Sequence, residues 1–86
     1  MSQLPAGLVV LSREGCGLCH EMLTALAEFE RSGTIPAVKI VDVDSDPELA
    51  RRYGLKVPVL LLDGSAICHY TLNSKELLRL VGGSPL

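Results

Sequence analysis

The chain has 86 residues, which suffices for one domain with a single core and leaves little room for a second. It is 48% hydrophobic and 21% charged, a balance that excludes a disordered chain. The net charge of −2, with scattered basic residues, excludes the basic face that nucleic acids require, and no apolar run is long enough to span a membrane. We expect one domain over residues 1–86 that is monomeric and, because the N-terminus lacks a secretory signal, cytoplasmic.

The first half of the chain predicts a strand, a helix and a second strand. Residues 8–11 are an uninterrupted apolar run, as in a central strand that is covered on both faces. From Cys16 to a stop at Ser32-Gly33, apolar residues recur at helical spacing, at Cys19, Met22, Leu23, Leu26 and Phe29. Residues 37–43 are rich in Val and Ile but carry two charges, which indicates a strand nearer the edge of the sheet.

A short second helix follows. Asp46 is a suitable N-cap, and Pro47 fits the first helical position, where its missing N–H costs nothing. Ser45 with Glu48 is an alternative capping pair that would move the start by one residue. We expect Gly54 to end the helix in a left-handed conformation.

The last part of the chain predicts a hairpin and a third helix. Residues 58–62 are a second apolar strand, and Asp63-Gly64 favours a tight turn into an antiparallel strand over residues 65–70. Asn73 caps the last helix, which ends at Gly82-Gly83. The order βαβαββα predicts an α/β fold in which three helices flank a mixed four-stranded sheet.

The motif Cys16-Gly17-Leu18-Cys19 lies where the first strand passes into the first helix. Two cysteines at this spacing on a first helical turn can close a disulfide. The first sulfur lies beside unpaired backbone N–H groups, which lower the pKa of a cysteine and favour the nucleophilic thiolate. The motif therefore predicts a reactive dithiol; the alternatives are a zinc site and two inert cysteines.

Two neighbouring residues are candidates for tuning the first thiol. Arg13 adds positive potential ahead of Cys16, and His20 follows it by one helical turn. The alternative for His20 is a solvated position on the helix surface. Residues 16–20 also match the C-x-x-C-H signature of covalent haem attachment, which we set aside because that chemistry needs an export signal.

Three further residues have a plain and a functional interpretation. Cys68, in the middle of a predicted strand, is either a buried inert thiol or a third redox thiol near the pair. Arg51 and Arg52 form either a solvated helix face or a contact for a carboxylate of glutathione.

Pro58 opens a strand after Val57, a position where a proline has no sheet hydrogen bond to donate. Together with the strand–CGLC–helix unit and the terminal hairpin, this pattern resembles the thioredoxin superfamily and, more narrowly, the small bacterial glutaredoxin-like proteins. The resemblance covers residues 8–81 and implies a thioredoxin-like fold with a cis Pro58 facing the dithiol. It also implies that Cys16 is the nucleophile, Cys19 the resolving thiol, and Val57 the residue whose backbone docks the thiol substrate.

The chain differs from glutaredoxins at two places. The usual Pro-Tyr between the cysteines is Gly17-Leu18, and the segment that caps the γ-glutamyl end of glutathione has no match in residues 67–71. The resemblance implies a thiol–disulfide oxidoreductase that acts on a disulfide-containing protein or on glutathione. We expect no bound cofactor or metal, with electrons from glutathione or a thioredoxin-type reductase. The alternative is a metal or iron–sulfur carrier that uses the same cysteines, with remaining ligands from a dimer or from glutathione.

Overall fold

The computed structural model describes residues 4–81. Within this range the chain forms β1 (Leu8–Ser12), α1 (Gly17–Arg31), β2 (Val38–Asp42), the 3-10 helix η1 (Val43–Ser45), α2 (Pro47–Tyr53), β3 (Val59–Leu62), β4 (Ser65–His69) and α3 (Ser74–Val81). The predicted order βαβαββα is confirmed. The predicted stop at Gly82-Gly83 lies outside the described residues.

The four strands form one mixed sheet in the order β2-β1-β3-β4. β1 is parallel to β2, with Leu8 opposite Val38, and antiparallel to β3, with Leu11 opposite Val59. β3 and β4 form the antiparallel hairpin. β1 lies in the middle and buries its first four residues, whereas β2 is an edge strand, as the sequence predicts.

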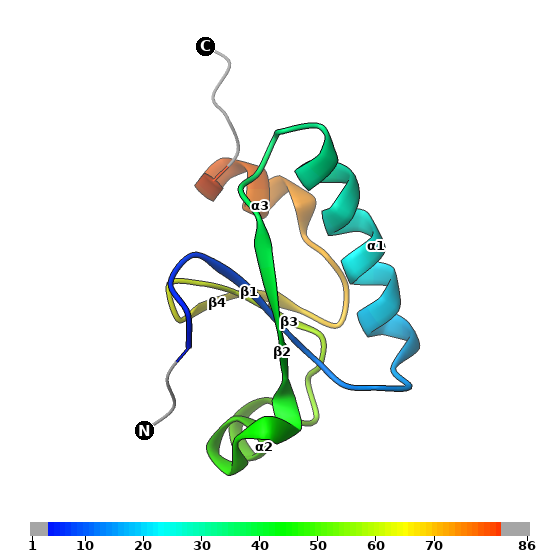
Figure 1. Cartoon of the computed structure of the whole chain (residues 1–86), viewed down its shortest axis with the longest axis vertical. Helices are drawn as coiled ribbons and strands as arrows, with labels where there is room; N and C mark the ends of the chain where they lie inside the picture. The colour runs from blue at the N-terminus through cyan, green and yellow to red at the C-terminus, as the bar shows by residue number, and fades with distance from the viewer. Residues whose placement is uncertain (1–3, 82–86) are drawn as a thin grey trace.

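The sheet separates two apolar cores, because successive residues of a strand point to opposite faces. On one face Leu8 and Val10 pack against residues of α1 and α3. On the other face Val9 and Leu11 pack against Leu49 of α2. In Figure 1, α1 lies on the right, α3 at the top and α2 at the bottom of the molecule. The fold is thus a three-layer α/β sandwich with α1 and α3 on one face and α2 on the other.

The local stops and caps follow the predictions with one correction. Asp63 and Gly64 have φ values of 50° and 86°, as a tight hairpin turn requires. The Asp46 side chain accepts the Glu48 N–H at 2.8 Å, so Asp46 is the cap of α2. Gly54 has φ −56° and ψ −31°, so the prediction of a left-handed stop is wrong.

Glycine at position 54 is explained by lack of space. A Cβ there would collide with the carbonyl oxygen of Ala50, and the Gly54 N–H donates to that same oxygen at 2.9 Å. The residue ends α2 in a right-handed conformation because the chain passes too close to the preceding turn for any side chain.

A β-bulge interrupts the hairpin. Leu60 pairs with Cys68 while the next residue, Leu61, pairs with Ala66, so Ile67 has no partner opposite it. As a result Ile67 and Cys68, although adjacent, both pack against the core on the α1 and α3 face.

Candidate active site

Cys16 is the N-cap of α1 and forms a disulfide with Cys19. Their Cα atoms are 5.2 Å apart, within the usual range for a disulfide. The Cys16 sulfur also accepts the backbone N–H of Cys19 at 3.1 Å, which is the hydrogen bond that a serine or aspartate oxygen makes at other N-caps. The sulfur of Cys16 therefore lies at the positive end of the helix.

The two cysteines differ in exposure. Cys16 is half-buried at the helix end, whereas Cys19 is 2% exposed and lies on the face of α1 that also buries Met22 and Leu26. This is the arrangement predicted from the helical spacing of the sequence. A reagent from solvent can reach the first sulfur while the second is shielded by the core.

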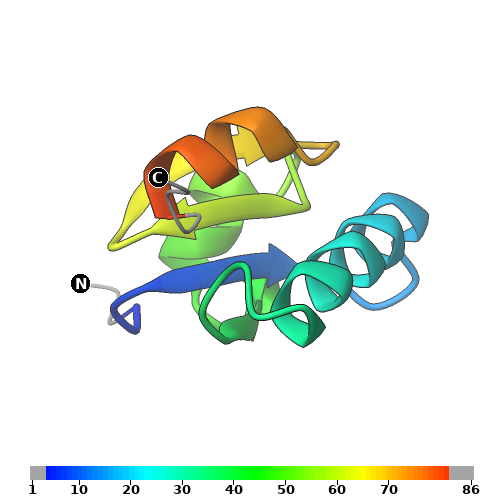
Figure 2. The ribbon, with the colours of Figure 1, turned by 90° about the horizontal axis from the view of Figure 1, so that it is seen from above.

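The peptide bond between Val57 and Pro58 is cis, as the resemblance implies. Pro58 is buried, and its carbonyl accepts the N–H of Tyr70 at 2.9 Å. Because Leu11 pairs with Val59, Pro58 lies beside the end of β1, from which the chain runs on to the dithiol. In Figure 2, β1 points towards the right-hand side of the molecule, where α1 starts, and the connection from β4 to α3 lies above on the same side. The docking role of the Val57 backbone stays a prediction.

Arg13, three residues before Cys16, connects its own loop to two other segments of the chain. Its guanidinium donates to both carboxylate oxygens of Asp44, at 2.8 and 2.9 Å, and to the carbonyl of Gly54 at 2.8 Å. The hydrogen bond and the charge of Arg13 hold the pKa of the Asp44 carboxyl below its ordinary value. Arg13 thus anchors the segment that leads to Cys16, and its tuning of that thiol stays a prediction.

His20 is exposed, and its backbone N–H donates to the carbonyl of Cys16 at 3.1 Å. This is the first hydrogen bond of α1, so His20 is a residue of the first turn. Its effect on the thiol also stays a prediction.

On α2, Arg51 pairs with Glu48, and the guanidinium carbon of Arg52 lies 5.3 Å from the centre of the Tyr53 ring. Both arginines are exposed.

Cys68 is half-buried in β4, and its sulfur accepts the N–H of Asn73 at 3.4 Å. Burial raises the pKa of this thiol above its ordinary value, which disfavours the reactive thiolate. These observations support the interpretation of Cys68 as a packed thiol with low reactivity.

Tyr70 and Leu55, which the sequence did not single out, lie at the site together with Leu18. Tyr70 has φ 68°, which is rare outside glycine, and its hydroxyl donates to the carbonyl of Leu55 at 3.0 Å. It shares a groove with Leu18, the residue between the cysteines. The position of Leu18 in the motif is visible in the sequence, but no local pattern indicates that residues 55 and 70 meet.

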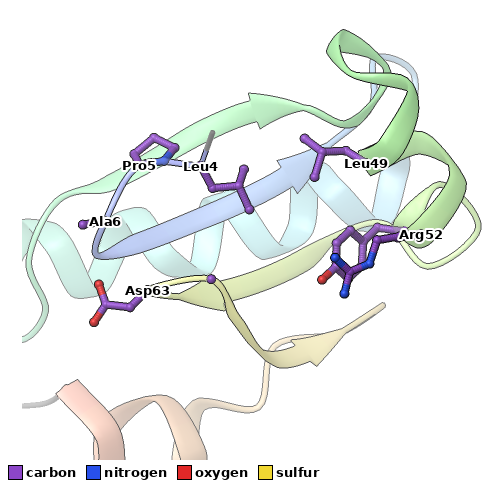
Figure 3. A pocket seen from close by; sticks show the side chains of 8 residues that line it. Leu4, Pro5, Ala6, Leu49, Arg52 and Asp63 are labelled. Carbon is purple, nitrogen blue, oxygen red and sulfur yellow. The ribbon is translucent and has the colours of Figure 1, made fainter. Parts of the chain in front are cut away.

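A second hollow lies away from the cysteines. It has a volume of about 400 Å³ and lies between the N-terminal segment, α2 and the hairpin turn, as Figure 3 shows for Leu4, Leu49, Arg52 and Asp63. Its lining includes no residue of the Cys16–Cys19 motif and neither Val57 nor Pro58, so it is separate from the dithiol.

Metal binding would need ligands beyond the pair. Across residues 4–81, no group of three or more His, Cys, Asp and Glu side chains is arranged to hold a metal ion. A carrier of a metal or cluster would therefore complete its site with a second chain or a small thiol. Anaerobic expression and a visible absorption spectrum test this alternative.

None of the helices among the described residues is long and apolar enough to cross a membrane.

A dithiol at the start of the helix that follows β1, beside a cis-proline that precedes the neighbouring strand, defines a protein of the thioredoxin-like fold. More narrowly, the chain belongs to the family described as Glutaredoxin-like domain (DUF836), whose profile matches residues 7–82. The family and the Cys16–Cys19 disulfide fit a thiol redox role. No curated protein matches the sequence.

Solved structures agree with this assignment. Protein Ne2328 from Nitrosomonas europaea is 31% identical over 94% of this chain and 96% of its own, with a TM-score of 0.78. The target protein XcR50 from X. campestris is 29% identical over 86% of this chain and 93% of its own, with a TM-score of 0.67. The holo form of glutaredoxin C1 from Populus tremula x tremuloides shares the fold at 23% identity, covering 86% of this chain and 72% of its own, with a TM-score of 0.50.

Proposed function

We propose that this protein is a thiol–disulfide oxidoreductase in which Cys16 is the nucleophile and Cys19 the resolving thiol. One observation carries the proposal: the two sulfurs are close enough to bond, and Cys16 is partly exposed whereas Cys19 is 2% exposed. An exchange reaction needs this asymmetry, because the substrate must reach one sulfur while the other waits within bonding distance.

The reduced protein begins the reaction with the Cys16 thiolate. The N–H of Cys19 and the other free N–H groups of the first turn of α1 stabilise its negative charge. The thiolate attacks one sulfur of a disulfide, so that a Cys16–substrate bond forms and the substrate disulfide breaks. The first substrate thiolate leaves and takes a proton from water.

The second step uses Cys19. Its thiol loses a proton and attacks the sulfur of Cys16, which releases the second substrate thiolate and closes the Cys16–Cys19 disulfide. The second substrate thiolate also takes a proton from water, so the substrate gains two electrons and two protons. The pair of cysteines loses two electrons, and its two protons pass to water, one when Cys16 ionises and one from Cys19. A thiol reductant, either glutathione or a dithiol reductase, returns the pair to its reduced form.

The surroundings of the pair suit the mixed-disulfide intermediate. The Val57-Pro58 segment lies at the same end of the sheet as the end of β1, and the Tyr70 N–H bonded to Pro58 holds it there. We propose that the backbone of Val57 pairs with the substrate backbone next to its cysteine. Arg13 keeps the opposite side of the loop in place through Asp44 and Gly54.

Three single variants test the proposal, with reduction of a peptide disulfide as the assay. Cys16→Ser should abolish the reaction, and Cys19→Ser should accumulate a mixed disulfide on Cys16 that mass spectrometry detects. Cys68→Ala is the matched control, because it removes a cysteine outside the pair, and should keep the activity of the original chain. A Cys16→Ser protein that is folded and still reduces the peptide would refute the mechanism.

A further inference from the structure

Large apolar side chains are exposed around the dithiol. Among the described residues, five large apolar side chains are exposed: Leu18, Ile40, Leu55, Tyr70 and Leu80. Three of them adjoin the site, since Leu18 lies between the cysteines, Tyr70 shares its groove, and Leu55 accepts the Tyr70 hydroxyl. Their exposed fractions are 41%, 46% and 92%, respectively. Clustered apolar surface of this kind marks a place where another molecule binds.

The groove beside Leu18 is apolar and small. Its walls are the first two turns of α1 and the connection from β4 to α3, and it is lined by Leu18, Glu21, Met22, Ala25, Tyr70, Thr71 and Leu72. Its volume is about 190 Å³. Pockets for whole small-molecule ligands measure about 300–1,000 Å³, so this groove is of a size for one side chain.

The charge of the groove is unfavourable for glutathione. Glu21 is the only charged residue in its lining, and neither Arg13 nor Lys56 contributes to it. The Tyr70 hydroxyl already donates to Leu55. The carboxylates of glutathione would thus meet a carboxylate and no cation, and glutathione has no apolar side chain to bury there.

The geometry points to a disulfide-bonded peptide or protein as the substrate, one that places an apolar side chain beside its reactive cysteine and into the groove between Leu18 and Tyr70. This inference rests on the proposed function, because the groove is lined by Leu18, which lies between the two cysteines. Tyr70 is then a specificity residue. Its ring forms one wall, and its hydrogen bonds to Leu55 and Pro58 hold that wall in place. The same reasoning favours a dithiol protein over glutathione as the reductant.

The experiment compares three symmetric disulfides with the trapping variant Cys19→Ser/Cys68→Ala. Two are dimers of one short uncharged peptide, with leucine or with serine on both sides of its cysteine, and the third is oxidised glutathione. Mass spectrometry gives the rate at which each forms a mixed disulfide with Cys16. Each rate is divided by that of the same disulfide with free N-acetylcysteine, which removes its intrinsic reactivity.

We expect the leucine peptide to react about 10-fold faster than the serine peptide, since burial of one apolar side chain changes specificity by about this factor or more. Oxidised glutathione should be slower than the leucine peptide by at least as much. Leu18→Ser and Tyr70→Ala should each reduce the preference to about twofold or less. Leu80→Ser is the matched control: Leu80 is 42% exposed, as Leu18 is, but lies on α3 outside the groove, and its variant should keep the full preference.

The outcomes separate the inference from the function on which it rests. If all three disulfides react faster with the protein than with N-acetylcysteine but their normalised rates are equal, the inference is overturned and the proposed oxidoreductase activity stands. A preference that survives in Leu18→Ser and Tyr70→Ala would overturn the groove as its cause. If none of the disulfides reacts faster than with N-acetylcysteine, the proposed function fails and the inference with it.

Discussion

Tyr70 offers a direct test of the backbone conformation at the edge of the site. Its φ of 68° lies in the left-handed region, which costs a residue with a Cβ about 1–2 kcal/mol and costs glycine little. Tyr70→Ala and Tyr70→Gly both remove the ring and its hydrogen bond to Leu55, so they differ only in backbone freedom. Glycine also raises the entropy of the unfolded chain, by about 0.4–1 kcal/mol relative to alanine. The glycine variant should therefore be the more stable by about 0.5–1 kcal/mol.

Thermal or urea unfolding of the two variants measures this difference. For a domain of this size it corresponds to a melting temperature about 2–8 °C higher for Tyr70→Gly than for Tyr70→Ala. Ala27, exposed in the middle of α1, is the control, and there glycine should cost about 1 kcal/mol. Glycine should thus be more stable than alanine at position 70 and less stable than alanine at position 27. A Tyr70→Gly variant that is less stable than Tyr70→Ala would contradict the left-handed conformation at position 70 and refute the reasoning.

Three further predictions concern the thiols and the anchor of the loop. In the reduced protein, iodoacetamide should modify Cys16 well before Cys19, which is 2% exposed; peptide mapping that finds Cys19 modified first would contradict the assigned roles. Because burial raises the pKa of Cys68, its alkylation in a Cys16→Ser/Cys19→Ser variant should be slower than that of a free cysteine at pH 8 and increase as the pH rises further. The pKa of Asp44 is lowered by Arg13, so the stabilisation from this pair is present above the ordinary pKa of an aspartate and is lost as the pH falls through the lowered value. Arg13→Gln should raise the NMR titration midpoint of Asp44, and an unchanged midpoint would show that the pair does not form in solution.

Two sets of hydrogen bonds hold the segments around the site. Arg13 connects it to Asp44 and to the end of α2, and Tyr70 connects the Val57-Pro58 segment to the connection that precedes α3. The loop that leads to Cys16 and the loop that carries the cis-proline are therefore each tied to a segment distant in sequence. Such positioning by supporting contacts lets the attacking sulfur meet a substrate in a reproducible geometry.

The elements themselves were predictable because their determinants are local. The apolar run at β1, the helical spacing from Cys19 onwards, the Asp46 cap and the Asp63-Gly64 turn each depend on residues within a few positions of one another. The dithiol was predictable for the same reason, since both cysteines and the helix end that surrounds them lie within four residues.

Gly54 shows where local reasoning is insufficient. A glycine at the end of a helix is usually left-handed, but here the close approach of the Ala50 carbonyl and the Arg13 side chain leaves no space for a Cβ. The bulge in β4 is a second case, because only the pairing with β3 reveals that Ile67 is the extra residue and that Cys68 turns toward the core.

The amino-acid sequence alone determined the order of strands and helices, the cysteine pair at the start of the first helix and the proline before the third strand, because short-range patterning and helix-end preferences act along the chain. Only the tertiary structure decided that Tyr70 reaches Leu55, that Arg13 is paired with Asp44, and that the groove beside the dithiol is apolar with a single carboxylate. These features arise where segments 15 to 50 or so residues apart meet. The directions in which these side chains point follow from strand register and helix packing, which no residue specifies by itself.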